Sequence, residues 1–259
     1  MSPRALRIAV PAGAFALLLV LWQIAATATE AYFLPSPISV VETLIDDWDI
    51  LGPALLVTLR ITLLALLLAI IGGVALAVAM AQSRLAELAI YPYAVVLQVT
   101  PIVAIAPILI VWIDDTETML LILAWIVAFF PVLGNTLAGL KSVDHNLLNL
   151  FELYGAGRWQ TLRFLKAPAA LPYFLTGLRI AGGLALIAAV VAEFAAGTGG
   201  AQSGLAYRIY MAQFTLNAPR TFAALLLLAL TGVAIFVVTG LIARRVLRRW
   251  HESAVPREN

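Results

Sequence analysis

Six long apolar runs dominate the sequence and limit what the chain can fold into. Each run is long enough to cross a hydrocarbon core about 30 Å thick, which takes about 20 helical residues. The runs cover residues 9–27, 54–81, 88–113, 119–140, 172–196 and 221–243. Alternating apolar and polar decamers, the mark of a membrane β-barrel, do not occur. Because only helices and closed barrels satisfy their backbone in lipid, we predict an all-α polytopic membrane protein with six transmembrane helices in one domain, 1–259.

The composition narrows the chemistry. The chain is 63% hydrophobic and 12% charged, whereas soluble domains have about 45–50% apolar and about 25% charged residues. It has no cysteine, and its two histidines, His145 and His251, have no neighbours at metal-ligand spacing. A net charge of +2 is too small to indicate nucleic acid. We therefore predict no catalytic residues, no metal site and no nucleic-acid partner.

The first apolar run follows "SPRALR" and precedes "ATA", a pattern that also occurs in cleaved secretory signals. The run is longer than the usual signal core of about 7–15 residues. Trp22, near its end, is typical of an interfacial anchor. We predict a retained first helix.

Charge is distributed unevenly between the two sides that these spans define. One side holds twelve of the 16 basic residues: Arg4, Arg7, Arg84, Lys141, Arg158, Arg163, Lys166, Arg244, Arg245, Arg248, Arg249 and Arg257. The other side holds Glu30, Glu42, Asp46, Asp47, Asp49, Asp114, Asp115 and Glu117, with Arg208 and Arg220. Basic loops stay inside, so we predict that both termini are cytoplasmic.

The outer segment 28–53 is predicted to contain a short helix on the membrane surface. Ser36 precedes Pro37, a helix-start pattern in which the missing proline N–H costs nothing. Ile38, Val41, Ile45 and Trp48 then share one helical face. This helix is either a structural strut or a contact for an external partner.

The cytoplasmic segment 141–170 contains "FELYGAGRWQTLRFLKAPAA" and is too polar to lie in lipid. Its apolar spacing predicts one helix before "YGAG" and a second short helix that ends at Pro168. Arg163 and Lys166 could instead only anchor the loop at lipid headgroups. A phosphate-binding glycine loop is disfavoured, because no strand precedes "GAGRWQ". The apolar residues of this hairpin point away from lipid. They must therefore be buried either beneath the transmembrane helices or in a groove on another protein.

This segment resembles the cytoplasmic signature of permease subunits of bacterial ABC importers. The signature reads Glu-Ala-Ala, three residues, Gly, nine residues, a branched apolar residue, any residue, then Leu-Pro. Gly155, Leu165 and Pro168 occupy the matching positions. The sequence departs from the pattern at Asn149, where the glutamate is expected, and at Ala167, where leucine is expected.

Other passages extend the resemblance over nearly the whole chain. They are "LPSPISVVETL", "LQVTPIVAIAPILIVWI", "AFFPVLGNTLAGLKSVD" and "VVAEFAAGTGG". Together they are similar to the branch that imports nitrate, taurine, alkanesulfonates and pyrimidine-type vitamin precursors. The fold implied is that of a type I ABC importer permease in the inner membrane.

The resemblance also implies partners and roles. It implies a second permease copy, two cytosolic ATPase subunits that hold the ATP and Mg, and a solute-binding protein, while the chain itself is a non-catalytic subunit that binds no cofactor. The hairpin would couple the membrane domain to the ATPase. The residues implied in that contact are Glu152, Leu153, Tyr154, Gly155, Ala156, Gly157, Arg158, Trp159 and Pro168.

Polar groups inside the spans are candidates for the translocation pathway, because buried ionisable residues in membranes are costly. Glu193 lies near the outer end of its span and either is solvated at the interface or lines the outer gate, with Arg60 as its expected counter-ion. Gln98, Thr100, Pro101 and Pro107 lie in the middle of the third span, where proline frees backbone carbonyls and kinks the helix. This kinked helix either is a wall of the cavity or has prolines that serve only packing. Asn135 is the candidate in the fourth.

Two more features are interpreted structurally. Arg179, near the cytoplasmic end of its span, is expected to snorkel. The stretches "IGGVALAVA" and "AGGLALIAA" are expected to mark close helix packing.

Two other function classes remain as alternatives. A self-contained secondary transporter or channel is disfavoured by the few intramembrane acids, and an integral-membrane enzyme by the lack of a catalytic constellation. The mostly neutral pathway candidates favour a neutral or aromatic organic solute.

Overall fold

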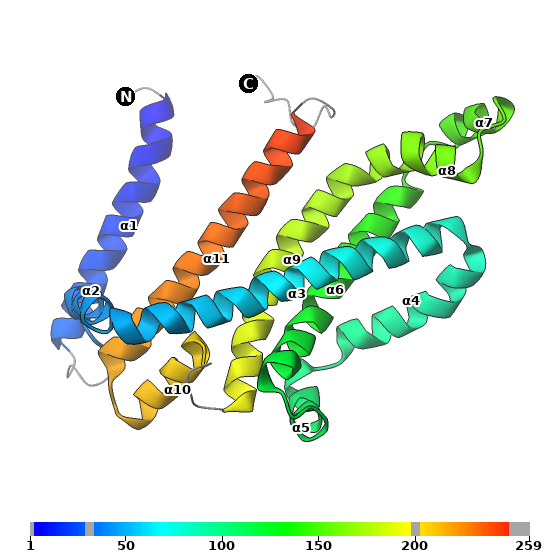
Figure 1. Ribbon diagram of the computed structural model, residues 1–259. Coiled ribbons are helices and arrows are strands. Elements are labelled where there is room, and N and C mark those ends of the chain that lie inside the picture. The colour runs from blue at the N-terminus through cyan, green and yellow to red at the C-terminus, as the bar shows by residue number, and fades with distance from the viewer. Residues whose placement is uncertain (1–2, 29–33, 198–202, 249–259) are drawn as a thin grey trace. The chain divides into compact units, whose positions relative to one another are not determined.

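The computed structural model describes residues 3–28, 34–197 and 203–248, which are almost entirely helical (Figure 1). The helices are α1 (Pro3–Ala28), α2 (Pro37–Asp46), α3 (Trp48–Gln82), α4 (Arg84–Val99), α5 (Ile102–Trp112), α6 (Thr116–Lys141), α7 (His145–Leu153), α8 (Arg158–Thr161), a π-helical turn (Leu162–Lys166), α9 (Ala167–Ala196), α10 (Leu205–Phe214) and α11 (Ala218–Leu247). These ranges contain no strand. The predicted all-α fold is confirmed.

Within the described residues, five helices are long and apolar enough to cross a membrane. They are α1, α3, α6, the helix that runs from Arg158 through the π-turn to Ala196, and α11. Five of the six predicted spans therefore have a continuous helix. The structure also contains α10, a short helix that the sequence patterns did not predict.

The third predicted span is broken. The kink predicted at its prolines is confirmed, but it is a complete break, because α4 and α5 meet at an angle of 100°. The break falls at Thr100 and Pro101, which both have extended backbone with ψ of 123° and 117°. A residue before proline avoids the helical region, and proline has no N–H to continue the hydrogen-bond ladder. The bent pair is either one broken span or a re-entrant segment.

The chain divides into two compact units, which we describe separately. The first contains the described residues up to Leu56 and from Ser203 to Ala229, and the second contains 57–197 and 230–248. Both α3 and α11 contribute residues to each unit.

The first unit is built around α2, α10 and the opening turns of α3 and α11. Its core contains Val40, Leu51, Leu205 and Ile209, all nearly inaccessible to solvent. At one edge the guanidinium of Arg220 donates two hydrogen bonds to the carboxylate of Asp47, at 2.6 and 2.9 Å. This bidentate ion pair joins the start of α11 to the end of α2.

Helix α2 begins where the sequence predicts. The Ser36 hydroxyl accepts a hydrogen bond from the N–H of Ser39, at 3.1 Å, and Pro37 occupies the first helical position. Ile38, Val41 and Ile45 are exposed on one face, while Val40 on the opposite face is buried. An exposed apolar face fits a helix that lies on the membrane surface.

The second unit is organised by the crossing of α6 and α9, which lie side by side (Figure 1). Glycines allow their backbones to touch. A Cβ on Gly139 would lie 2.7 Å from Ala170 Cα, and one on Gly177 would lie 2.6 Å from Pro131 O. Helix α3 also approaches α6 closely, since a Cβ on Gly73 would lie 3.0 Å from Val132. Close packing through the first small-residue stretch, which contains Gly73, is confirmed.

Candidate functional site

The predicted cytoplasmic hairpin begins with α7. The Asp144 carboxylate caps this helix by accepting a hydrogen bond from the N–H of Asn146, at 2.7 Å. Leu147 and Leu150 lie on one apolar face of α7, and both side chains are exposed within this chain. The helix therefore leaves part of its apolar side uncovered by the described residues.

The glycine of the signature ends α7 for a definite physical reason. Gly155 has a φ of +69°, in the left-handed region that side chains disfavour. The N–H of Gly155 donates to Glu152 O and the N–H of Ala156 donates to Phe151 O, both at 2.9 Å. These two bonds define a Schellman motif, which satisfies carbonyls at the end of the helix.

The second arm of the hairpin differs from the prediction. A short helix ending at Pro168 was wrong, because α8 continues through the π-turn directly into α9. The N–H of Ala167 donates to Leu162 O, five residues back, as in a π-helix. Proline lacks an N–H and clashes with the carbonyl four residues earlier, so the wider turn accommodates Pro168 without a break. Pro168 therefore lies in the first turn of α9, away from the tip.

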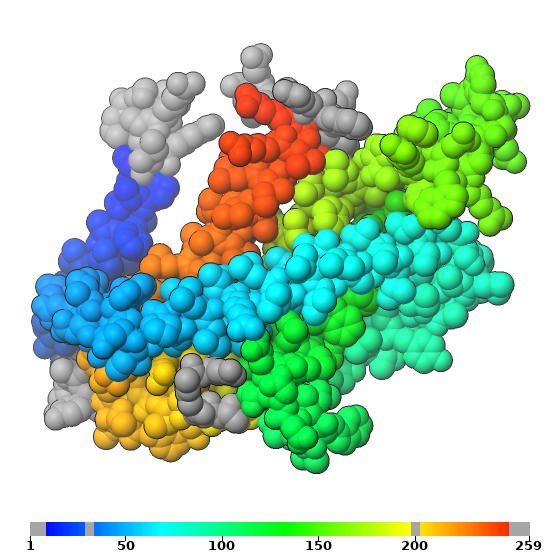
Figure 2. Space-filling model, in the orientation of Figure 1, coloured from blue at the N-terminus to red at the C-terminus, as the bar shows by residue number. Residues whose placement is uncertain are grey.

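The tip between α7 and α8 exposes large side chains. Leu153, Tyr154 and Trp159 are 85%, 83% and 73% exposed. Figure 2 shows this tip, in green at the upper right, as a projection of the second unit. The Gln160 side chain accepts a hydrogen bond from the N–H of Gly157, at 2.7 Å, and so fixes the start of α8. An ordered turn with uncovered apolar side chains is suited to contact another protein.

Glu193 lies in a buried contact at the end of α9 opposite to the tip. It is 3% exposed, and the hydroxyl of Thr58 donates to its carboxylate at 2.7 Å. The predicted ion pair with Arg60 was wrong, because the Arg60 guanidinium pairs with Glu117 at 2.7 Å. Interfacial solvation of Glu193 is also excluded in this structure, since the side chain is enclosed.

The loop before α6 directly precedes Glu117 in the sequence. Asp115 caps α6, accepting from both the hydroxyl and the N–H of Thr118. These two donors hold the pKa of the Asp115 carboxyl below its usual value.

The remaining pathway candidates lie elsewhere. Gln98 is exposed near the end of α4, and the Thr100 hydroxyl donates to Val96 O at the break before Pro101. Asn135 lies on α6 against Gly177, and its amide donates to Pro131 O at 2.8 Å. The six candidates are therefore distributed over α3, α4, the break before α5, α6 and α9 of the second unit.

Arg179 contacts an aromatic ring, and its expected snorkelling stays a prediction. Its guanidinium lies over the ring of Phe236, with 3.7 Å between the carbon of the guanidinium and the ring centroid. A cation over an aromatic face is electrostatically stabilised.

The structure contains two recesses that were not predicted from the sequence. One is an apolar cavity of about 520 Å³ between α3, α6 and α9, which contains Thr136. The other lies in the first unit and is lined by Tyr207, Arg208 and Arg220. The Nε of Arg208 is buried there and has no hydrogen-bond partner among the described residues. The adjacent polar pair Asn135–Thr136 in an apolar span was the available signal for the first recess; the second depends on α10, which was not predicted.

Comparison with known proteins gives consistent matches. Residues 69–248 match the family described as "Binding-protein-dependent transport system inner membrane component". The chain is 38% identical to the formylaminopyrimidine transport permease protein ThiX of Halalkalibacterium halodurans, over 85% of this chain and 87% of that protein. It is 36% identical to the riboflavin transport system permease protein RibX of Chloroflexus aurantiacus, over 92% of this chain and 88% of that protein. It is 31% identical to the taurine transport system permease protein TauC of Escherichia coli, over 96% and 92%.

Proposed function

Because this chain belongs to the family of binding-protein-dependent transport system inner membrane components, we propose that it is the permease of an ABC importer for a neutral heteroaromatic solute. Membership makes it a multi-pass inner-membrane protein and the permease subunit of such an importer. The solute class is the finer part of the proposal. The observation that carries the coupling mechanism is the ordered, uncovered tip between α7 and α8.

The tip is proposed to dock on a cytosolic ATPase. Leu153, Tyr154 and Trp159 present apolar and aromatic area of the kind that anchors protein interfaces. The Schellman turn at Gly155 holds them in one arrangement before binding, which lowers the entropy lost on docking. The ATP and Mg belong to that ATPase, and this chain acts without catalysis.

The solute class is supported by charge. Apart from the basic residues near the helix ends, the cations described within the spans of the second unit are Arg60 and Arg179. The Arg60 guanidinium pairs with Glu117, and that of Arg179 lies over the Phe236 ring. A sulfonate or nitrate would need an available cation in the pathway, because burying an unpaired anion is costly. Two relatives of 36–38% identity are named for formylaminopyrimidine and riboflavin transport, which fits a heteroaromatic solute better than taurine.

The assembly is proposed to contain two copies of this chain, two ATPase subunits and an external solute-binding protein. Both termini are placed in the cytoplasm on the basis of the charge asymmetry. This orientation puts the tip on the ATPase side.

The test is reconstitution of the permease in liposomes with its ATPase and binding protein. We expect ATP-dependent uptake of riboflavin or a formylaminopyrimidine. Leu153→Ser and Tyr154→Ser are expected to weaken ATPase binding roughly tenfold or more. Val111→Ser, on an equally exposed side chain of α5, is the control and should leave binding unchanged. Uptake without any ATPase would instead establish a secondary transporter or channel.

A further inference from the structure

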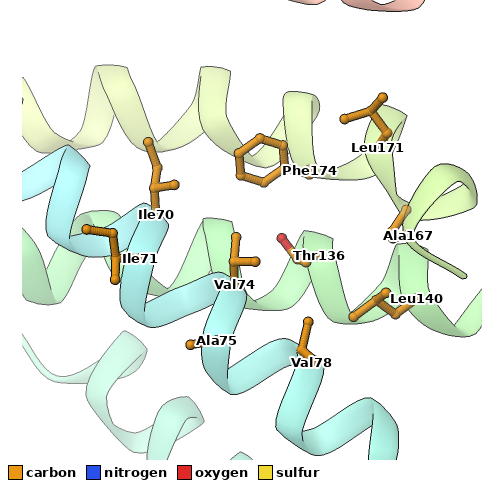
Figure 3. A pocket seen from close by; sticks show the side chains of 11 residues that line it. Ile70, Ile71, Val74, Ala75, Val78, Thr136, Leu140, Ala167, Leu171 and Phe174 are labelled. Carbon is orange, nitrogen blue, oxygen red and sulfur yellow. The ribbon is translucent and has the colours of Figure 1, made fainter. Parts of the chain in front are cut away.

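The apolar cavity of the second unit lies between three helices (Figure 3). Its walls include Ile70 and Val74 of α3, Ala167 and Phe174 of α9, and Thr136 of α6. The volume of about 520 Å³ lies within the range of small-molecule sites. The lining has one polar side chain, Thr136, and no charged one.

Thr136 differs from several threonines in the apolar segments of the second unit. The hydroxyls of Thr62, Thr100, Thr176 and Thr239 each donate to the carbonyl four residues earlier, at 2.6–3.0 Å. The Thr136 hydroxyl has no hydrogen-bond partner among the described residues, although the residue is only 4% exposed. Figure 3 shows its oxygen pointing into the space between Val74 and Phe174. A buried hydroxyl without a partner is unfavourable, so an occupant that supplies one is stabilised there.

The lining defines the chemistry of that occupant. It must be uncharged, mostly apolar or aromatic, and must carry a hydrogen-bonding group within reach of Thr136. The Phe174 ring offers a surface against which an aromatic ring can pack. A lipid acyl chain fills apolar space but leaves the hydroxyl unsatisfied. The backbone of a helix from a second copy also leaves the hydroxyl unsatisfied, because its carbonyls already accept hydrogen bonds within that helix.

We propose that this cavity is a binding station for the ring of the transported solute, with Thr136 as its hydrogen-bonding residue. This inference rests on the proposed function and specifies where the heteroaromatic solute is held. Ala167 in the wall belongs to the first turn of α9, which continues from α8 and the tip. A movement of the tip therefore moves one wall of the station, which links ATPase binding to release of the ring.

The test of the hydroxyl uses Thr136→Val, which removes it and keeps the shape, and Thr136→Ser, which keeps it. In the reconstituted complex we expect Thr136→Val to lower uptake of riboflavin or formylaminopyrimidine roughly three- to tenfold at an equal amount of assembled complex. Thr136→Ser and the control Thr176→Val should transport like the unmodified protein. Equal uptake by Thr136→Val would overturn the proposal.

A second measurement does not depend on the Thr136 variants. The chain has no cysteine, so Ala75→Cys, in the exposed part of the lining, gives a single reactive thiol. Riboflavin or formylaminopyrimidine should slow its alkylation and taurine should not, whereas Ala104→Cys on α5 should be unaffected by all three. The proposed binding station would be overturned if neither riboflavin nor formylaminopyrimidine slowed alkylation of this thiol. It would also be overturned if the alkylation rate depended only on the chain length of the lipid.

The two proposals can fail separately. If the unmodified complex transports no solute in an ATP-dependent manner, the proposed function is refuted. Normal ATP-dependent heteroaromatic uptake without protection of Ala75→Cys would refute only the station.

Discussion

The crossing of α6 and α9 gives a prediction whose size follows from the structure. A Cβ on Gly177 would lie 2.6 Å from Pro131 O and 2.8 Å from Asn135 Cβ. Since the interior is close-packed, the helices must separate by about 0.8 Å to restore an ordinary contact. Overpacking of this kind costs about 1–3 kcal/mol. We therefore expect Gly177→Ala to destabilise the protein.

Gly183→Ala is the matched control on the same helix, because nothing lies within 4 Å of its added Cβ. Both substitutions gain the same helix propensity, up to about 1 kcal/mol, so the difference between them isolates the steric cost. That difference corresponds to about 3–9 °C in the midpoint of thermal unfolding. The assay is thermal unfolding of both variants in detergent, followed by tryptophan fluorescence. Equal midpoints, or a more stable Gly177→Ala, would refute the inferred contact between the two backbones.

Three further predictions address local contacts. Gly155→Ala should destabilise the tip by about 1–2 kcal/mol, because its φ of +69° disfavours a side chain, and hydrogen exchange of α7 would detect it; unchanged exchange would contradict the Schellman motif. Thr58→Val should cost about 1–3 kcal/mol by removing a donor to buried Glu193, with Thr58→Ser as the control in the same unfolding assay. Replacing Asp47 by Asn should lower stability by about 1–3 kcal/mol, since the bidentate bond with Arg220 is charge-assisted; no change in unfolding midpoint would show that the pair contributes nothing.

The sequence predicted the features that depend on local patterns. Long apolar runs gave five continuous spans, and Ser36–Pro37 gave the start of α2. In the third span the prolines predicted a kink, and the extended backbone of Thr100 and Pro101 turns that kink into a complete break. At Pro168 the opposite error occurred, because a π-turn absorbed a residue that was expected to end the helix.

The features that were missed depend on contacts between distant segments. Arg60 could be paired with Glu193 or Glu117 on charge alone, and only the packed helices decide for Glu117. The cavity at Thr136 is formed by α3, α6 and α9 together, so no single segment reveals it. Helix α10 is short and carries charge, which hides it from a search for apolar spans.

The continuity of α8, the π-turn and α9 has a mechanical consequence. The helix extends from Arg158 to Ala196, and Gly177, where it touches Pro131 most closely, lies 19 residues from each end. At about 1.5 Å per residue, each arm is about 28 Å long. A rigid rod that pivots at its midpoint moves its two ends by equal distances in opposite directions. A sideways shift of the tip by a few ångströms would therefore displace the end that carries Glu193 by the same amount the other way.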